Sequence, residues 1–164
     1  MIELLVFDVD GCLSDGKITY TSDGIELKSF NVKDGLAITS WHKLGKKSAI
    51  ITGRESKIVE QRARELGISY LFQKVHNKDE VLESILREES LGFENVAAIG
   101  DDLNDYKMLK RIGWSFTPKN GSHFVKEIVD TVLNTNGGEG AVREMIDIIC
   151  ERENLTEEFV KLWQ

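Results

Sequence analysis

Several residue types are scarce in this chain, and their scarcity narrows the classes of protein it can belong to. The 164 residues include one proline, Pro118, and two cysteines, Cys12 and Cys150. The cysteines are far apart and neither has a CxxC or CxxH partner, which argues against a zinc site and against a disulfide framework. We expect both to be buried and to act as small apolar side chains.

Long apolar runs and an excess of positive charge are also missing. No apolar stretch approaches the roughly 18 residues that a membrane-spanning helix needs, and the sequence does not open with a basic segment followed by a signal-type apolar one. We therefore expect a cytoplasmic protein with no membrane partner. The net charge is −7, and no cluster of Lys and Arg stands out, so no nucleic-acid partner is expected.

The remaining composition, 41% hydrophobic and 30% charged, is that of an ordinary folded protein. The length suits a single domain spanning residues 1–164. Strand-like and helix-like segments alternate, which predicts an α/β fold with a doubly wound, mostly parallel, Rossmann-like sheet. We expect strands beginning at residue 4 and at 48–51, 70–72, 96–99, 114–116 and 131–133, and helices at 34–44, 56–66, 78–89, 141–152 and 156–163. Asp34 is expected to be the N-cap of the first of these helices and not a ligand.

A β-hairpin is predicted between the first strand and the first long helix. Residues 17–20 and 25–28 alternate in polarity around an Asp-Gly turn. This flap, about residues 15–30, is too small to be stable as an isolated ribbon. It must therefore lean on another surface, and we expect that surface to be a neighbouring subunit.

The first apolar strand ends in two acids and a glycine, Asp8-Val9-Asp10-Gly11. Ligands of open α/β sheets bind beyond the carboxyl ends of the strands. With the two-residue period of a strand, the side chains of Asp8 and Asp10 leave the same face. Two converging carboxylates favour a hard cation such as Mg²⁺, although a DxDG segment by itself can equally be a turn or a helix cap.

Three later segments carry further polar residues, each after a strand-like run. Thr52 and Gly53 follow the second strand of the sheet, Lys78 begins a helix, and a cluster of three acids follows the run Val96 to Ile99: Asp101, Asp102 and Asp105. Taken alone, Thr52 could be an ordinary strand end and Lys78 a solvated residue. Adjacent carboxylates after an apolar strand repel one another unless a cation is present, so the acid cluster favours a metal site.

Together these residues fit phosphoryl transfer, in which a protein mostly positions groups and stabilises charge. We predict that Asp8 is the nucleophile and that Asp10 acts as general acid and base. Mg²⁺ would be held by Asp8, the Asp10 carbonyl and Asp101. Lys78 and the groups around Thr52 and Gly53 would neutralise the phosphoryl group. Asp102 and Asp105 would lie next to these residues without contacting the substrate, and Asp105 would hold Lys78 or a water molecule.

The segments DVDG, ITGR, the lysine of HNKDE and GDDLND resemble the four motifs of the haloacid dehalogenase superfamily of phosphotransferases. In that family an acid two residues after the nucleophile marks phosphatases and phosphomutases. A receiver-type signalling domain is the alternative from another class, but there the acid pair, threonine and lysine come in a different order. A third alternative is a catalytically silent oligomerisation scaffold, which measurable turnover would exclude.

Further segments, among them DGCLSDGKITY, ELKSFNVKDGLAI and GGEGAVRE, resemble the small capless branch typified by 3-deoxy-D-manno-octulosonate 8-phosphate (KDO 8-phosphate) phosphatase. The resemblance implies a Mg²⁺-dependent phosphomonoesterase, a phosphorylated sugar acid as substrate, a homotetramer and a role in lipopolysaccharide precursor synthesis. Lys74 and Asn77 depart from the branch, which commonly has glycine and aspartate there. Phosphatases of nine-carbon sugar acid 9-phosphates therefore remain an alternative.

The spacing between motifs leaves no room for a cap domain. An uncapped site benefits from cover by a neighbouring copy, because water must be kept from the acyl phosphate. Arg54 is the best candidate to bind the sugar carboxylate, since its guanidinium binds bidentately, and Arg143 is a second candidate. Each could instead be a surface charge, and the glycines at 137, 138 and 140 could form either a flexible turn or a substrate-contacting loop.

Overall fold

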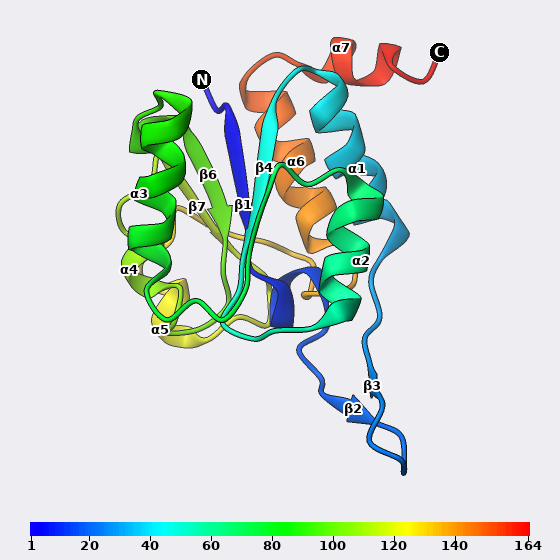
Figure 1. Ribbon diagram of the computed structural model, residues 1–164. Coiled ribbons are helices and arrows are strands. Elements are labelled where there is room, and N and C mark those ends of the chain that lie inside the picture. Colours follow the sequence, from blue (N-terminus) through cyan, green and yellow to red (C-terminus); the bar gives the residue numbers. More distant parts are fainter.

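A six-stranded sheet forms the centre of the molecule in the computed structural model, which describes all of residues 1–164 (Figure 1). Its order is β5-β4-β1-β6-β7-β8, and every neighbouring pair is parallel. The doubly wound parallel sheet predicted from the sequence is therefore confirmed. The strands are β1 (Leu4–Phe7), β4 (Lys47–Ile51), β5 (Tyr70–Phe72), β6 (Val96–Ile99), β7 (Trp114–Thr117) and β8 (Thr131–Val132).

Helices cover both faces of the sheet. On one face lie α1 (Val32–Lys43), α2 (Lys57–Leu66) and α6 (Ala141–Arg152), and on the other lie α3 (Lys78–Glu89), α4 (Tyr106–Leu109) and α5 (His123–Lys126). The last helix, α7 (Thr156–Lys161), packs beside α6, and a short 3₁₀ turn, η2 (Phe93–Asn95), precedes β6. None of the helices has the length and hydropathy that crossing a bilayer requires.

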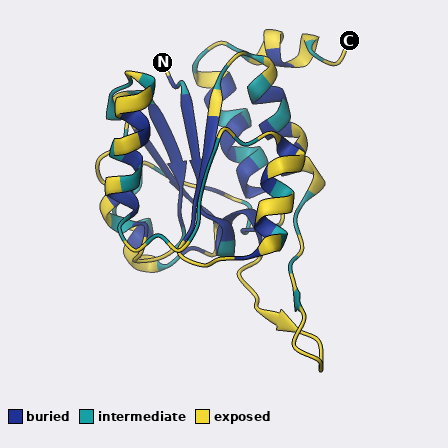
Figure 2. Ribbon diagram, in the orientation of Figure 1, coloured by how far each residue is buried: buried dark blue, intermediate teal, exposed yellow.

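The two faces bury separate hydrophobic cores. Leu5 and Phe7 of β1 point into the core with α1, α2 and α6, whereas Leu4 and Val6 point into the core with α3, α4 and α5. All four side chains are fully buried, and Figure 2 shows β1 as buried along its length. Burial on both faces explains why this strand is a continuous apolar run instead of an alternating one.

The start of α1 differs from the prediction. Asp34 was expected to cap a helix over 34–44, but the helix begins at Val32 and its cap is Asn31, whose Oδ1 accepts a hydrogen bond from the Lys33 backbone N–H at 2.9 Å. Asn31 and Asp34 are both capping residue types, and the earlier one is used. Asp34 is instead buried in the first turn of the helix, where it accepts a hydrogen bond from the Arg143 backbone N–H at 2.8 Å.

Other helix ends follow the sequence signals. Ser56 caps α2, accepting a hydrogen bond from the Ile58 backbone N–H at 3.2 Å, and Gly67 ends that helix with a left-handed φ of 68°. Helices α3 and α6 have the predicted bounds. Cys12 and Cys150 are both free and buried, as expected.

The predicted hairpin is present as a separate two-stranded sheet of β2 (Thr19–Tyr20) and β3 (Glu26–Leu27). Its turn contains Gly24 with a left-handed φ of 86°, which a glycine adopts without steric cost. The hairpin is the only insertion between β1 and α1 apart from the turn η1 (Val9–Leu13), and it extends away from the sheet (Figure 1). Between β4 and α3 there are only α2 and β5, so the chain carries no cap at either position.

Candidate active site

A polar cavity of 290 Å³ lies at the carboxyl ends of β1, β4 and β6. This is where parallel α/β sheets bind their ligands. None of the residues lining the cavity is hydrophobic, so it suits a strongly hydrated ligand better than an apolar one. The lining residues are Asp8, Asp10, Gly16, Thr52, Gly53, Arg54, Asp101, Asp102 and Asn104.

Lys78 links two buried acids beneath this cavity. Its Nζ lies 2.6 Å from Asp8 Oδ1 and 2.5 Å from Asp105 Oδ1. Burial lowers the pKa of Lys78, but the carboxylates of Asp8 and Asp105 more than offset this and hold the pKa above its ordinary value. Lys78 is therefore a fixed positive charge next to Asp8. Asp105 also accepts a hydrogen bond from the Asp101 backbone N–H at 3.0 Å, which orders the acidic loop after β6.

Asp8 and Asp101, which are distant in sequence, converge at one point. Their carboxylate oxygens and the Cys12 sulfur all lie within 4.8 Å of one another. Burial, and then repulsion from nearby acids, raise the pKa of Asp8 to about 7 and that of Asp101 to about 8. This site therefore has more negative charge than Lys78 alone compensates, which is the electrostatic condition for binding a cation.

Oxygen ligands dominate this cluster. Burial and the surrounding carboxylates raise the pKa of the Cys12 thiol well above its ordinary value, so the sulfur stays protonated and is a poor ligand. The two carboxylates are the hard donors that Mg²⁺ prefers. Gly11 is essential to their approach, because a Cβ at that position would overlap the Asp101 carboxylate.

Asp10 reaches the same cavity by a different route from the one predicted. Strand β1 ends at Phe7, and residues 9–13 form the irregular turn η1, so the two-residue period of a strand does not relate Asp8 to Asp10. Both side chains line the cavity, but they have different partners. Asp8 contacts Lys78, whereas Asp10 Oδ1 lies 2.5 Å from Nζ of Lys28.

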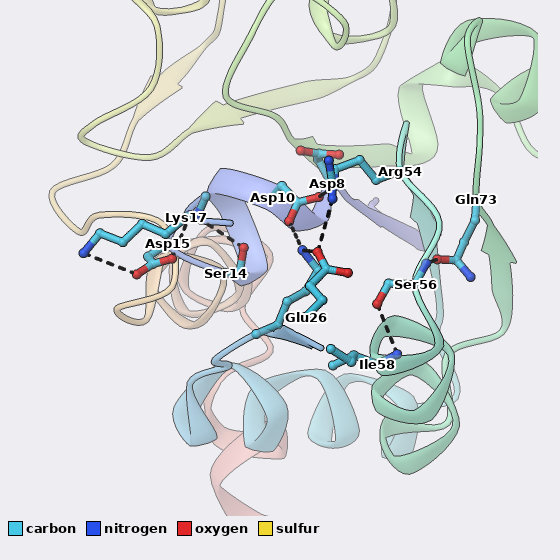
Figure 3. A network of polar contacts seen from close by, with 12 residues as sticks. Asp8, Asp10, Ser14, Asp15, Lys17, Glu26, Arg54, Ser56, Ile58 and Gln73 are labelled. Atoms are coloured by element: carbon cyan, nitrogen blue, oxygen red, sulfur yellow. Dashed lines mark hydrogen bonds and ion pairs between the residues drawn. The ribbon is translucent and has the colours of Figure 1, made fainter. Parts of the chain in front are cut away.

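Thr52, Gly53 and Arg54 follow directly after β4. The Thr52 backbone N–H donates to the Phe72 carbonyl at 3.0 Å, which holds the end of the strand in place. The Arg54 guanidinium lies 3.2 Å from Glu26 and 3.8 Å from Asp10. Figure 3 shows Asp10, Glu26 and Arg54 pointing toward one another at the base of the hairpin.

The acidic loop after β6 places its other members at the rim. Asp102 lines the cavity and is exposed, and its carboxylate accepts a hydrogen bond from the Leu103 backbone N–H at 2.8 Å. Asp105 is fully buried and lies against Lys78, below the cavity. The three acids of the GDDLND segment therefore occupy three different environments.

Arg143 is the candidate that the structure does not bring to this site. Its Nε donates to both carboxylate oxygens of Asp147, at 2.9 and 2.8 Å, along α6, and it does not line the cavity. Arg143 therefore lies outside the cavity of its own chain, and its role in binding substrate stays a prediction. The reason is local, because an acid four residues further along the helix pairs with it.

The glycine loop before α6 packs against the turn η1 and does not line the cavity. The Gly138 N–H donates to the Cys12 carbonyl at 3.0 Å. A Cβ on Gly137 would overlap the Gly11 carbonyl oxygen, and one on Gly138 would overlap the backbone of Asp15. These glycines are required because two backbones touch there.

Sequence reasoning missed four residues at or next to the cavity: Gly16, Asn104, Glu26 and Lys28. The first two are common residue types in loops and carry no distinctive signal. Glu26 and Lys28 are separated by two positions in a predicted strand, so their side chains leave the same face. That pairing of an acid with a base was a usable signal that the hairpin faces other charges.

Comparisons with known proteins agree with this geometry. A model of the haloacid dehalogenase-like hydrolase family matches residues 70–146. The 3-deoxy-D-manno-octulosonate 8-phosphate phosphatase KdsC of Escherichia coli is 41% identical over 148 residues, which cover 90% of this chain and 79% of that protein.

Solved structures of such phosphatases have the same fold. The enzyme from Moraxella catarrhalis, in complex with a magnesium ion, a phosphate ion and KDO, matches with a TM-score of 0.95 and 39% identity over 99% of this chain and 94% of that chain. A cobalt-bound form from Haemophilus influenzae matches with a TM-score of 0.89 and 36% identity over 93% and 90% of the two chains. On this similarity over nearly its whole length, the chain belongs to the 3-deoxy-D-manno-octulosonate 8-phosphate phosphatase family of haloacid dehalogenase-like hydrolases.

Proposed function

We propose that this protein is a Mg²⁺-dependent phosphatase that hydrolyses KDO 8-phosphate to KDO and inorganic phosphate. The observation that carries the proposal is the convergence of Asp8 and Asp101, with Lys78 bonded to Asp8, in a cavity without hydrophobic lining. The relatives named for this activity support the choice of substrate. Such a reaction would contribute to lipopolysaccharide precursor synthesis.

Two chemical steps follow from the arrangement. A carboxylate oxygen of Asp8 attacks phosphorus, the bond to the sugar oxygen breaks, and Asp10 donates a proton to that departing oxygen. Asp10 then takes a proton from a water molecule that attacks the aspartyl phosphate, which releases phosphate and regenerates Asp8. Throughout both steps Lys78 keeps a positive charge beside Asp8.

The residues present fit Mg²⁺. Asp8, the Asp10 carbonyl and Asp101 would hold the ion, and the raised pKa values of Asp8 and Asp101 come partly from carboxylate repulsion that a cation relieves. When bound, the metal supplies positive charge that neutralises the phosphoryl oxygens. Thr52 and Gly53 line the same cavity, and the Thr52 hydroxyl and the Gly53 backbone N–H would bind the remaining phosphate oxygens.

Arg54 is the residue we propose to bind the carboxylate of the sugar acid. It lines the cavity and its side chain is 43% exposed, so a ligand can reach it. Lys74 and Asn77, which depart from the family pattern, do not line the cavity. Lys74 has a left-handed φ of 55°, the conformation that favours glycine. The departure therefore keeps the backbone turn and leaves the binding residues unchanged.

We also propose that residues 1–164 work as one capless domain and that four copies assemble through their hairpins, with each site completed by a neighbour. The hairpin exposes four large apolar or aromatic side chains to solvent: Ile18, Tyr20, Ile25 and Leu27. Exposed apolar patches of this kind favour association. The two free cysteines suit a reducing, cytoplasmic location.

The test is phosphate release with Mg²⁺ from a panel of phosphorylated eight- and nine-carbon sugar acids. We expect KDO 8-phosphate to be the best substrate. Asp8→Asn should lower phosphate release at least about 10³-fold, because it removes the nucleophile. Glu157→Gln, the same carboxylate-to-amide change at a 91% exposed side chain of α7, is the control and should leave the rate unchanged.

The outcomes separate the parts of the proposal. Release that Asp8→Asn does not reduce would disprove the nucleophile. Faster release from a nine-carbon 9-phosphate would identify that compound, and not KDO 8-phosphate, as the substrate. No release from any of these compounds would show that phosphorylated sugar acids are not the substrates.

A further inference from the structure

Four charged side chains form a closed ring at the base of the hairpin. Lys28 Nζ lies 2.5 Å from Asp10 and 3.4 Å from Glu26, and the Arg54 guanidinium lies 3.2 Å from Glu26 and 3.8 Å from Asp10. Opposite charges alternate around the ring. The hairpin contributes Glu26 and Lys28, whereas Asp10 comes from the turn after β1 and Arg54 from the end of β4.

The burial of Lys28 is unusual for a residue of an extended hairpin. Its side chain is 1% exposed, whereas the side chain of Lys17 in the same hairpin is 80% exposed. Burying a lysine is unfavourable unless its charge is paired. The Lys28 side chain is therefore held at Asp10 by its surroundings. It does not sample the many conformations of a solvated lysine.

Asp10 has two cationic neighbours, and each contacts a different oxygen of its carboxylate. Lys28 contacts Oδ1 at 2.5 Å, and Arg54 Nε lies 3.8 Å from Oδ2. Without Lys28, Asp10 would be free to close on Arg54, which would move the carboxylate and also occupy a guanidinium that lines the cavity. A misplacement of about 1 Å can cost 10²-fold in rate.

From this ring we propose that Lys28 is a positioning residue, which holds the Asp10 carboxylate where it can give a proton to the leaving alcohol and take one from water. The role rests on the phosphatase activity proposed above. It gives the hairpin a second task within its own chain, separate from any contact between subunits.

The experiment compares two substrates with different need for an acid. The value of kcat/KM covers the steps up to loss of the leaving group. KDO 8-phosphate releases an alkoxide, which must be protonated, whereas p-nitrophenyl phosphate releases a phenolate that departs without a proton. The variants are Lys28→Met, which keeps the length of the side chain without its charge, and Lys28→Arg, which restores the charge. Lys161→Met, at a 70% exposed lysine of α7, is the matched control.

For Lys28→Met we expect kcat/KM to fall about 10- to 100-fold with KDO 8-phosphate, a part of the full effect of acid–base catalysis. With p-nitrophenyl phosphate it should fall less than about 3-fold. Lys28→Arg should recover most of the loss, and Lys161→Met should behave like the wild type. In an Asp10→Asn background, Lys28→Met should cause no further loss, because the two residues act through one function.

Equal losses with both substrates, or no loss in a folded Lys28→Met protein, would overturn the role of Lys28. Lys28→Gln is a second variant for which the same leaving-group dependence is expected, should the methionine protein not fold. If the wild type hydrolyses p-nitrophenyl phosphate but not KDO 8-phosphate, the proposed substrate fails, and a second alkyl phosphate then tests Lys28. If the wild type hydrolyses no phosphate ester, both proposals fail.

Discussion

The central strand and the hairpin bury opposite kinds of side chain. In β1, Leu4 to Phe7 are 0% exposed. In the hairpin the apolar residues Tyr20 and Leu27 are 59% and 51% exposed, while the side chain of Lys28 is 1% exposed. The sheet is therefore stabilised by hydrophobic burial within the chain. The hairpin is held by ion pairs at its base, and its apolar side chains lie on the surface.

Substituting the two buried lysines, Lys78 and Lys28, should give the largest difference between the two regions. Lys78 is surrounded by Asp8 and Asp105 below the sheet ends, so Lys78→Met leaves buried carboxylates without their cation. We expect activity to fall at least about 10²-fold and the free energy of unfolding to fall by about 3–5 kcal/mol. Urea denaturation without metal and phosphate-release assays measure these two effects.

Lys28→Met provides the contrast for that measurement, because the hairpin lies outside both hydrophobic cores. Its free energy of unfolding should change much less than that of Lys78→Met. A similar loss of stability in both variants would mean that the hairpin is part of the cooperative core, and the distinction between the two regions would fail.

Identical leucine truncations test the apolar side of the comparison. Leu5→Ala in β1 should lower the free energy of unfolding by about 2–5 kcal/mol, since it leaves a cavity in a packed core. Leu27→Ala in the hairpin should change the stability of dilute, dissociated protein by less than about 0.5 kcal/mol. It should instead weaken the assembly, which sedimentation over a range of protein concentrations would show as a lower mass.

The opposite pattern would break the comparison. A Leu27→Ala protein that keeps its assembly but loses several kcal/mol of stability would show that Leu27 packs within its own chain. Leu27→Met keeps the apolar surface and is the matched control.

A smaller effect is expected where the hairpin joins α1. Burial raises the pKa of Asp34 from 3.8 to about 6, partly offset by the hydrogen bond from the Arg143 backbone N–H. A carboxyl group whose folded-state pKa is raised contributes stability that is fully present below pH 3.8 and is lost as the pH rises through about 6.

Asp34→Asn removes this titration. Between pH 4 and 7 the free energy of unfolding of the wild type should therefore decrease relative to that of the variant, by on the order of 2 kcal/mol. Thermal unfolding at a series of pH values measures this difference. Asp130→Asn is a control on another acid that accepts backbone hydrogen bonds. If the wild-type and Asp34→Asn curves stay parallel over this range, Asp34 ionises normally and the buried carboxylate has another partner.

Local sequence patterns were sufficient to predict the sheet and the strand ends that carry the motifs. The apolar runs of β1 and β6 can be satisfied only by burial on both faces, and parallel strands bring their carboxyl ends to the same edge. That reasoning predicted that Asp8, Thr52 and Asp101 would meet, and all three line one cavity. The cap of α1 was misplaced because Asn31 and Asp34 carry the same local signal.

The sequence by itself determined the parallel α/β architecture, the hairpin and the convergence of carboxylates, because these depend on hydrophobic periodicity, turn residues and strand direction. Only the tertiary structure decided which charged side chains pair. It joined Lys28 to Asp10, placed Lys78 between Asp8 and Asp105, and buried Asp34 against the start of α6. Ion pairs between distant residues leave no periodic trace in a sequence, because a charge can select its partner only after the backbone has placed both groups within a few ångströms.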